Sequence, residues 1–121
     1  MKRKILVIED DKAIALALSV RLMANDYNVL SAHDAVTGLQ TALRDRPDLI
    51  VLDICLPGGG GLVTAEWLRN SGLTQGIPFI VVTASKKPGL RERAEELGAV
   101  GFFQKPYEAQ ELLDAIRAVV S

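Results

Sequence analysis

Residues 49–53 read LIVLD, four consecutive apolar residues followed by an aspartate. Two similar apolar runs occur in the chain, ILVI at residues 5–8 and FIVV at residues 79–82. Runs without polar alternation are typical of strands that are buried on both faces of a parallel sheet. Weaker runs at residues 29–32 and 100–103 are typical of edge strands. The sequence therefore predicts five strands, with the three strongest at the centre of the sheet.

Helical segments separate the predicted strands. They lie near residues 12–25, 35–45, 62–71, 88–97 and 107–120. Short apolar strands that alternate with helices predict an α/β fold, in which a doubly wound parallel sheet carries helices on both faces. Asp34 is placed to cap the second helix, and Gly98 to end the fourth.

The length and composition of the chain are those of one globular domain spanning residues 1–121. The formal net charge of -1 gives no electrostatic reason to expect binding to nucleic acid or to an anionic membrane. No apolar run approaches the roughly 18 residues that a membrane span needs. The single cysteine, Cys55, excludes an internal disulfide and suits the cytoplasm. The single histidine, His33, leaves no zinc cluster and is expected to be a surface or half-buried residue at the end of the second strand, away from the site.

Polar side chains follow four of the predicted strands. They are Glu9-Asp10-Asp11, Asp53, Thr83-Ala84 and Lys105-Pro106. Each of these alone has an ordinary explanation, such as a helix cap, strand propensity or a solvated lysine. Ligands of open α/β sheets bind outside the carboxyl ends of the strands, so the coincidence of four such positions predicts a shared site there.

The residue types at this edge indicate phosphoryl transfer. Neighbouring carboxylates repel one another and stay ionised together only beside a cation. Oxygen ligands without soft donors favour Mg²⁺ or a similar divalent ion. Such an ion, a lysine and a hydroxyl can neutralise and orient a phosphoryl group. An aspartate can itself be the nucleophile and form an acyl phosphate.

A glycine run, Gly58 to Gly61, follows Asp53 and Pro57. It is not a nucleotide-binding loop, because no Gly-Lys-Ser/Thr follows and Val63 breaks the dinucleotide fingerprint. Each glycine gives up roughly 0.5–1 kcal/mol of ordering relative to alanine. One hypothesis is that a mobile loop shortens the acyl-phosphate lifetime or becomes ordered on phosphorylation or partner binding. The other is that this position merely tolerates glycine.

The four strand-end motifs resemble, in order and spacing, those of the receiver domains of two-component response regulators. The resemblance covers essentially the whole chain. It implies a (βα)5 flavodoxin-like fold with strand order 2-1-3-4-5. It also implies a phosphoacceptor that takes a phosphoryl group from a partner phosphohistidine with Mg²⁺. Phosphorylation would then switch the surface formed by the fourth helix, fifth strand and fifth helix.

By this resemblance Asp53 is the phosphoacceptor. The same resemblance implies that Asp11, Asp53 and the backbone carbonyl of Cys55 bind Mg²⁺ directly. Asp10 is expected to hold the ion through water. The side chain of Cys55 is expected to be inert, although its position influences hydrolysis in this family.

The resemblance assigns roles to three further residues. Lys105 is expected to pair with the phosphoryl group and to have a cis bond to Pro106. Thr83 is expected to move its hydroxyl to a phosphoryl oxygen. Phe102 is expected to turn inward when Thr83 moves, whereas Phe103 is expected to pack in the core.

The first helix is apolar on more than one side. We expect one stripe to face the sheet, made of Ala13, Leu16, Ala17, Val20 and Ala24. The other apolar residues are then exposed, namely Ile14, Ala15, Leu18 and Leu22. Such a patch beside the site, of which Ile14, Ala15 and Leu18 lie closest, predicts a docking surface. The resemblance implies a sensor histidine kinase or a histidine phosphotransfer protein as the partner, and admits a homodimer.

Three other functions compete with this prediction. An aspartyl-phosphate phosphatase would carry a second aspartate where Cys55 stands, and a flavin carrier would not place Glu9-Asp10-Asp11 beside the flavin phosphate. A degenerate receiver would act as a phosphorylation-independent interaction module, but the set of acidic, hydroxyl and lysine residues argues against it. We therefore predict a signalling phosphoacceptor and not an enzyme with a turnover substrate.

Overall fold

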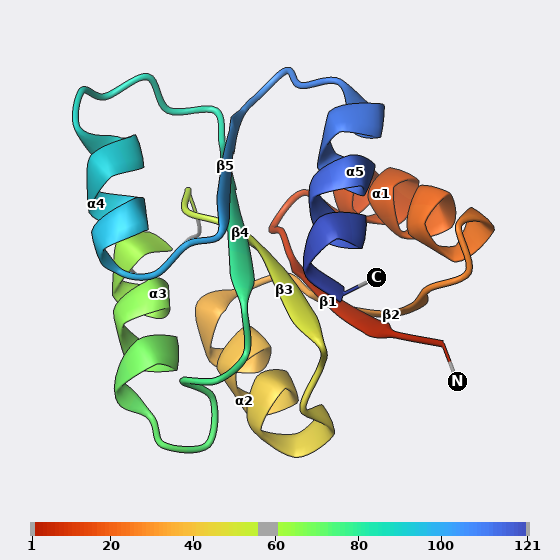
Figure 1. The fold of residues 1–121 in the computed structure, drawn as a ribbon, viewed down its shortest axis with the longest axis horizontal. Coiled ribbons are helices and arrows are strands. Elements are labelled where there is room, and N and C mark those ends of the chain that lie inside the picture. Colours follow the sequence, from red (N-terminus) through yellow and green to blue (C-terminus); the bar gives the residue numbers. More distant parts are fainter. Residues whose placement is uncertain (1, 56–60, 121) are drawn as a thin grey trace.

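The structure is a computed structural model that describes residues 2–55 and 61–120. Within these residues, strands and helices alternate along the chain, which confirms the predicted α/β fold (Figure 1). The strands are β1 (Lys4–Ile8), β2 (Asn28–Ala32), β3 (Leu49–Asp53), β4 (Phe79–Thr83) and β5 (Gly101–Gln104). The helices are α1 (Lys12–Ala24), α2 (Ala35–Asp45), α3 (Gly61–Asn70), α4 (Leu90–Glu96) and α5 (Ala109–Val120).

The strands form one parallel sheet in the order β2-β1-β3-β4-β5, as the resemblance implied. The register pairs Ile8 of β1 with Leu52 of β3, and Asp53 with Val82 of β4. The residues that follow Ile8, and those that end β3 and β4, therefore meet at one edge of the sheet. This register explains why residues far apart in the sequence can build one site.

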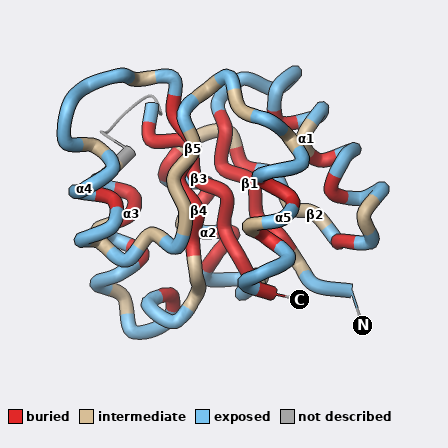
Figure 2. The backbone as a smooth tube through the Cα atoms, turned by 45° about the horizontal axis from the view of Figure 1, so that its top comes forward, coloured by how far each residue is buried: buried red, intermediate tan, exposed pale blue. Residues whose placement is uncertain are grey.

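Helices cover both faces of the sheet, with α1 and α5 on one face and α2, α3 and α4 on the other (Figure 1). Side chains alternate along each strand, so Leu6 and Ile8 face the three-helix side while Ile5 and Val7 face the two-helix side. Figure 2 shows the buried residues concentrated in the strands and the exposed ones on the outer helix surfaces. Among the described residues, no helix is long and apolar enough to cross a membrane.

The predicted orientation of α1 is wrong. Ala15, Ser19 and Leu22 are buried against the sheet, whereas Leu16 is 64% exposed and Val20 is 55% exposed. The buried stripe contains a serine, whose hydroxyl donates to the Ala15 carbonyl oxygen at 2.7 Å. Because this bond satisfies the polar group, Ser19 can be buried, and periodicity alone did not identify its face as the inner one.

Several predicted ends are correct and others shift. Asp34 caps α2 by accepting from the Thr37 backbone N–H at 2.7 Å, and Gly98 follows α4 with a left-handed φ of 100°, as expected. The fourth helix is shorter than predicted, because it begins only after Gly89, whose φ of 84° is also left-handed. Most of the glycine run falls within residues 56–60, so the two hypotheses about that loop lie outside the described residues.

Candidate functional site

The carboxyl ends of β1, β3, β4 and β5 bring four side chains together. Glu9 follows β1, Asp53 ends β3, Thr83 ends β4 and Lys105 follows β5. Glu9, Asp53 and Thr83 are all buried, which is unusual for two carboxylates unless they are paired. The predicted gathering of polar residues at this edge is therefore present in the structure.

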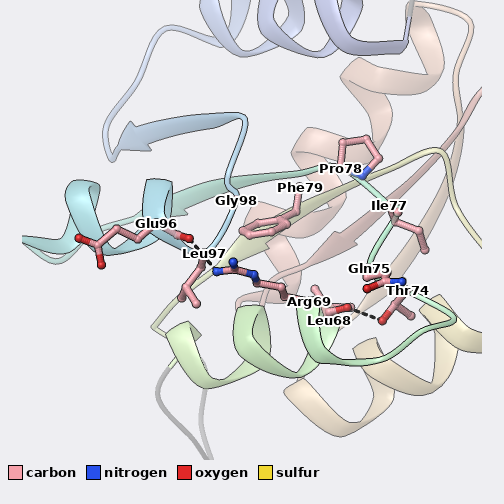
Figure 3. A pocket seen from close by; sticks show the side chains of 11 residues that line it. Leu68, Arg69, Thr74, Gln75, Ile77, Pro78, Phe79, Glu96, Leu97 and Gly98 are labelled. Atoms are coloured by element: carbon pink, nitrogen blue, oxygen red, sulfur yellow. Dashed lines mark hydrogen bonds between the residues drawn. The ribbon is translucent and has the colours of Figure 1, made fainter.

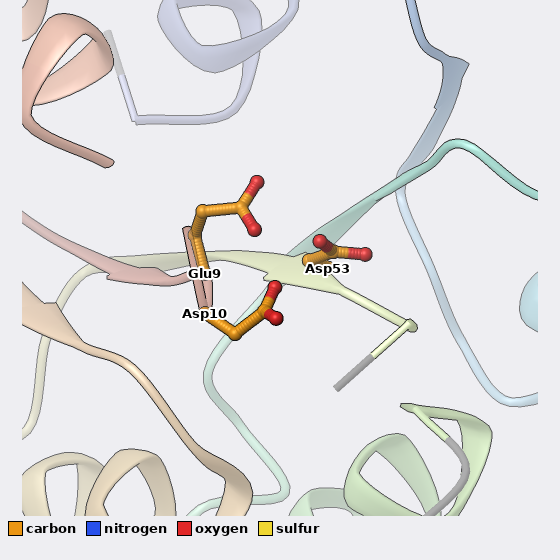
Figure 4. A group of neighbouring side chains, drawn as sticks. All are labelled: Glu9, Asp10 and Asp53. Carbon is orange, nitrogen blue, oxygen red and sulfur yellow. The ribbon is translucent and has the colours of Figure 1, made fainter. Parts of the chain in front are cut away.

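Three carboxylates form the acidic part of the site. Oxygen atoms of Glu9, Asp10 and Asp53 all lie within 4.8 Å of one another. Figure 4 shows the three side chains converging on one space from the ends of two strands. Hard divalent cations such as Mg²⁺ prefer donor sets made of oxygen, so these residues fit that ion.

Asp11 lies outside this cluster. Its Oδ1 atom accepts from the backbone N–H groups of Ala13 at 2.9 Å and Ile14 at 3.0 Å, so its carboxylate caps α1. Glu9 occupies the acidic cluster instead, and sequence reasoning missed it. With three consecutive acidic residues, the sequence alone did not decide whether Glu9 and Asp10 or Asp10 and Asp11 join Asp53 in the cluster. The available signal was the start of α1 at Lys12, which places Asp11 at the preferred capping position.

This difference gives a testable prediction about neighbouring aspartates. Asp11→Ala should lower the free energy of unfolding by about 0.5–2 kcal/mol, because α1 loses its cap, and should keep Mg²⁺ binding. Asp10→Ala should instead weaken Mg²⁺ binding roughly tenfold or more. Calorimetric titration with Mg²⁺ measures the second effect, and urea unfolding measures the first. Equal weakening of Mg²⁺ binding by both variants would return Asp11 to the metal site.

Lys105 neutralises part of the acidic cluster. Its Nζ atom donates to Asp53 Oδ2 at 3.1 Å and also forms an ion pair with Glu9 Oε1. The Lys105–Pro106 peptide bond is cis, as expected from the resemblance. The backbone N–H of Lys105 donates to the Thr83 carbonyl oxygen at 2.7 Å, which anchors the lysine beside β4.

The electrostatics of the cluster follow from its surplus of carboxylates. Burial, together with the neighbouring Asp53, raises the pKa of Glu9 from 4.5 to about 7, although Lys105 acts in the opposite direction. Burial by itself lowers the pKa of Lys105, but the hydrogen bonds and charges of Glu9 and Asp53 outweigh burial and raise it. The cluster holds three carboxylates, of which Lys105 pairs with two, and this surplus of acidic groups is what would attract a divalent cation.

The pKa of Glu9 predicts how stability depends on pH in the absence of Mg²⁺. Its folded value lies above its unfolded value, so the native state holds a proton that the unfolded chain has released. The free energy of unfolding should therefore fall as the pH rises from 4.5 to about 7. Urea unfolding across this range should show the fall in the wild type and not in Glu9→Gln. Parallel curves for the two proteins would contradict the assignment to Glu9.

The Thr83 hydroxyl has two partners in the structure. Its Oγ1 atom accepts from the Ser85 backbone N–H at 3.0 Å and lies 3.2 Å from Cys55 Sγ. The backbone N–H of Cys55 donates to Asp53 Oδ1 at 2.8 Å. Cys55 thus contacts both the predicted phosphoacceptor and the predicted switch threonine, and the chemical inertness of its thiol stays a prediction.

Phe102 and Phe103 lie on opposite sides of the sheet. Phe102 is half-buried against the core of the three-helix face, and the Arg91 guanidinium lies 4.9 Å from the centre of its ring. Phe103 packs on the two-helix face, with its ring centre 6.0 Å from that of Tyr107. Core packing of Phe103 agrees with expectation. The inward turn of Phe102 stays a prediction.

His33 is half-buried, as expected, but it contacts the backbone of Glu9, so the expectation that it lies away from the site is wrong. Its Nδ1 atom is 2.9 Å from the Glu9 carbonyl oxygen. A carbonyl oxygen can only accept, so Nδ1 carries the proton and donates it. The backbone N–H of Glu9 in turn donates to the Ala32 carbonyl oxygen at 2.9 Å. The end of β2 therefore holds the backbone of Glu9 at both of its polar groups.

A hollow of about 250 Å³ lies at the other end of β4 (Figure 3). It is bordered by Phe79, which begins β4, whereas Thr83 ends that strand at the acidic site. Arg69 Nη1 crosses it to donate to the Glu96 carbonyl oxygen at 2.7 Å, which ties α3 to α4. The hollow is therefore separate from the acidic cluster and carries none of its residues.

Comparison with known proteins gives a consistent set of similarities. Residues 5–117 match the protein family described as response regulator receiver domain. The chain is 37% identical to the response regulator MprA of Mycobacterium ulcerans (strain Agy99), over 99% of this chain and 51% of that protein. The chain therefore spans about half the length of the curated relatives that it matches.

Solved structures are also similar. A CheY-like response regulator receiver domain protein from Methanospirillum hungatei JF-1 gives a TM-score of 0.91 at 27% identity, covering 98% of this chain and 93% of that chain. The receiver domain of the sensor histidine kinase PA1611 from Pseudomonas aeruginosa PAO1 gives 0.88 at 25% identity, with 99% and 98% covered. That structure has a magnesium ion coordinated in its active-site cleft.

Proposed function

The chain belongs to the response regulator receiver domain family, and on that basis we propose that Asp53 is its phosphoacceptor. The observation that carries this proposal is the surroundings of Asp53. Asp53 is 3% exposed, and its carboxylate accepts from the Lys105 ammonium at 3.1 Å and lies in a cluster with Glu9 and Asp10. The site therefore combines a nucleophile, a cation for the phosphoryl oxygens and a group of carboxylates that could hold a metal ion.

The proposed reaction is transfer of a phosphoryl group from a phosphohistidine. One Asp53 oxygen attacks phosphorus, and the bond between phosphorus and the imidazole nitrogen breaks. The nitrogen keeps the electron pair, and the product is an acyl phosphate on Asp53. Lys105 neutralises charge on the phosphoryl oxygens, and the Thr83 hydroxyl donates a hydrogen bond to one of them.

Asp10 and Asp53, with the backbone carbonyl of Cys55, are the residues that we propose to hold Mg²⁺. Asp10 takes the place that the sequence assigned to Asp11, because Asp11 is committed to the α1 cap. Glu9 completes the acidic cluster and pairs with Lys105. When bound, Mg²⁺ would supply neutralising charge for the phosphoryl oxygens. The magnesium ion in the PA1611 receiver domain supports this choice of ion.

Phosphorylation would act as a switch and not as a step in substrate turnover. Movement of the Thr83 hydroxyl toward the phosphoryl group would free space beside Phe102, which connects β5 to α4 through its contact with Arg91. We propose that this pair changes the surface of α4, β5 and α5. That surface is also where a homodimer would form. A cytoplasmic location agrees with this role, since histidine kinases present their phosphoryl groups there.

The function is tested by the intact mass of the protein after incubation with phosphoramidate. With Mg²⁺, we expect one phosphoryl adduct. With Mg²⁺ removed by EDTA, we expect none. If the wild type shows no adduct, the same protein is titrated with beryllofluoride and Mg²⁺, which mimic the phosphorylated state without hydrolysing in the same way. Failure of a folded wild type in both measurements would overturn the proposal.

The partner surface follows from the corrected orientation of α1. Of the three docking residues predicted from the sequence, Ala15 is 1% exposed and cannot contact a partner, Leu18 is half-buried, and Ile14 is 42% exposed. The exposed apolar residues of α1 lie on two sides of the buried stripe, with Ile14 on the side of Leu18, and Leu16, Val20 and Met23 together on the other side. We propose that a sensor histidine kinase or histidine phosphotransfer protein docks on the side of α1 that carries Ile14 and Leu18, because it begins beside the acidic site.

Ile14→Glu tests this surface. It should slow phosphoryl transfer from an autophosphorylated histidine kinase about tenfold, because a charge replaces an apolar contact in the interface. Labelling by phosphoramidate should be unchanged, since that small donor needs no docking. Val36→Glu is the matched control, because Val36 is also an exposed apolar residue but lies on α2 at the opposite face of the sheet. Equal slowing with both donors would mean that the substitution damages the site itself.

A further inference from the structure

Cys55 contacts two of the residues on which the proposed reaction depends, Asp53 and Thr83. Its backbone N–H donates to Asp53 Oδ1 at 2.8 Å, and its sulfur lies 3.2 Å from the Thr83 hydroxyl oxygen. Asp53 and Thr83 end the neighbouring strands β3 and β4. The backbone of Cys55 is therefore fixed by its bond to the phosphoacceptor, and this places the thiol beside the switch hydroxyl.

The Thr83 hydroxyl needs an acceptor for its single hydrogen, because the side chain is 0% exposed and water cannot supply one. The Ser85 backbone N–H already donates to the hydroxyl oxygen at 3.0 Å, so that bond uses a lone pair and not the hydrogen. Among the described residues, the Cys55 sulfur is the hydrogen-bond partner that can take this hydrogen. Since S–H is only a weak donor, the bond runs from the Thr83 hydroxyl to the sulfur.

We propose that Cys55 is a positioning residue for Thr83, whose sulfur holds the hydroxyl hydrogen until a phosphoryl oxygen on Asp53 replaces it. This inference rests on the proposed function, because it takes Thr83 as a donor to the phosphoryl group. Sulfur is a weak acceptor, whereas a hydrogen bond to a charged oxygen is roughly twice as strong as a neutral one. The resting bond thus fixes the hydroxyl without preventing its release.

The strength of the resting bond should set the affinity for a phosphoryl mimic. Cys55→Ala leaves the Thr83 hydrogen without a partner in the resting protein, which makes the resting arrangement less favourable. Beryllofluoride with Mg²⁺ should then bind about 2- to 10-fold more tightly than to the wild type. Cys55→Ser restores an acceptor and should return the affinity toward the wild-type value.

A double-mutant cycle shows whether this effect passes through Thr83. In a Thr83→Val background there is no hydroxyl, so Cys55→Ala should leave the beryllofluoride affinity unchanged. The same tightening in both backgrounds would overturn the proposal, because Cys55 would then act on the metal or on Asp53. An unchanged affinity for Cys55→Ala in the wild-type background would overturn it as well.

A second measurement needs no phosphoryl mimic and so separates this inference from the proposed function. Three-bond NMR couplings to the Thr83 methyl carbon report the side-chain rotamer in the Mg²⁺-free protein. The wild type and Cys55→Ser should each show one rotamer, and Cys55→Ala should show averaging. Wild-type couplings in Cys55→Ala would overturn the positioning role. A wild type that fails to bind beryllofluoride would overturn the proposed function, while the couplings still decide the role of Cys55.

Discussion

Asp53→Asn should leave no phosphoryl adduct after incubation with phosphoramidate and Mg²⁺, whereas the wild type should carry one. Asparagine keeps the size of the side chain and its acceptor for the Cys55 backbone N–H, but its amide cannot attack phosphorus as a carboxylate does. The loss should be complete, because no partial substitute for the nucleophile remains at the end of β3. Intact mass spectrometry of the two proteins in parallel measures the difference.

Asp114→Asn is the matched control for this loss. Asp114 is exposed on α5 and its nearest ion-pair partner is Arg117, so the same chemical change there should leave the adduct intact. An adduct on Asp53→Asn would show that another residue accepts the phosphoryl group. A folded wild type that lacks the adduct and does not bind beryllofluoride would instead favour a phosphorylation-independent interaction module.

Lys105→Met should be the most destabilising substitution in the site. It keeps the apolar stem but leaves the buried carboxylates of Glu9 and Asp53 without their ammonium partner. Removing one member of a buried ion pair typically costs about 3–5 kcal/mol. Urea unfolding in the absence of Mg²⁺ should show this loss, and saturating Mg²⁺ should recover part of it, because the cation binds the native carboxylates.

Two further variants make the Lys105 prediction specific. Lys87→Met makes the same change at an exposed lysine and should alter stability by no more than about 0.5 kcal/mol. Adding Glu9→Gln to Lys105→Met removes one of the two unpaired carboxylates and should restore much of the lost stability. If Lys105→Met unfolds at the same urea concentration as the wild type, the ion pair does not stabilise the fold.

The sheet was predictable because its central strands are runs of apolar residues. Such a run is fully buried only where helices cover both faces of the sheet. The side of α1 that faces the sheet was not predictable, because apolar residues surround that helix. The buried stripe includes Ser19, which hydrophobicity counts against burial, but its hydroxyl donates to the Ala15 carbonyl oxygen and lies 3.3 Å from the Ser31 hydroxyl, so its burial is acceptable. Hydrophobic periodicity cannot register such a local hydrogen bond.

The residue types of the site were predicted correctly from the sequence. The acidic residues after β1 were predicted one position away from those that form the cluster. The positions of Asp53, Thr83 and Lys105 at one edge were expected from the strand ends. Which of the three adjacent acidic residues enter the cluster, however, depends on where the backbone turns after β1. The start of α1 sets that turn. The contact of His33 with Glu9 depends on β2 lying beside β1, a relation between strands that no local pattern carries.

The ion pair between Glu9 and Lys105 joins residues that are 96 positions apart in the chain. During synthesis, Glu9, Asp10 and Asp53 leave the ribosome before Lys105 does, so these acidic residues are available before their ammonium partner. Contacts between such distant positions are slow to form, because much of the chain must be ordered before they close. The acceptor chemistry thus becomes complete only when β5 has docked, which ties competence for signalling to completion of folding.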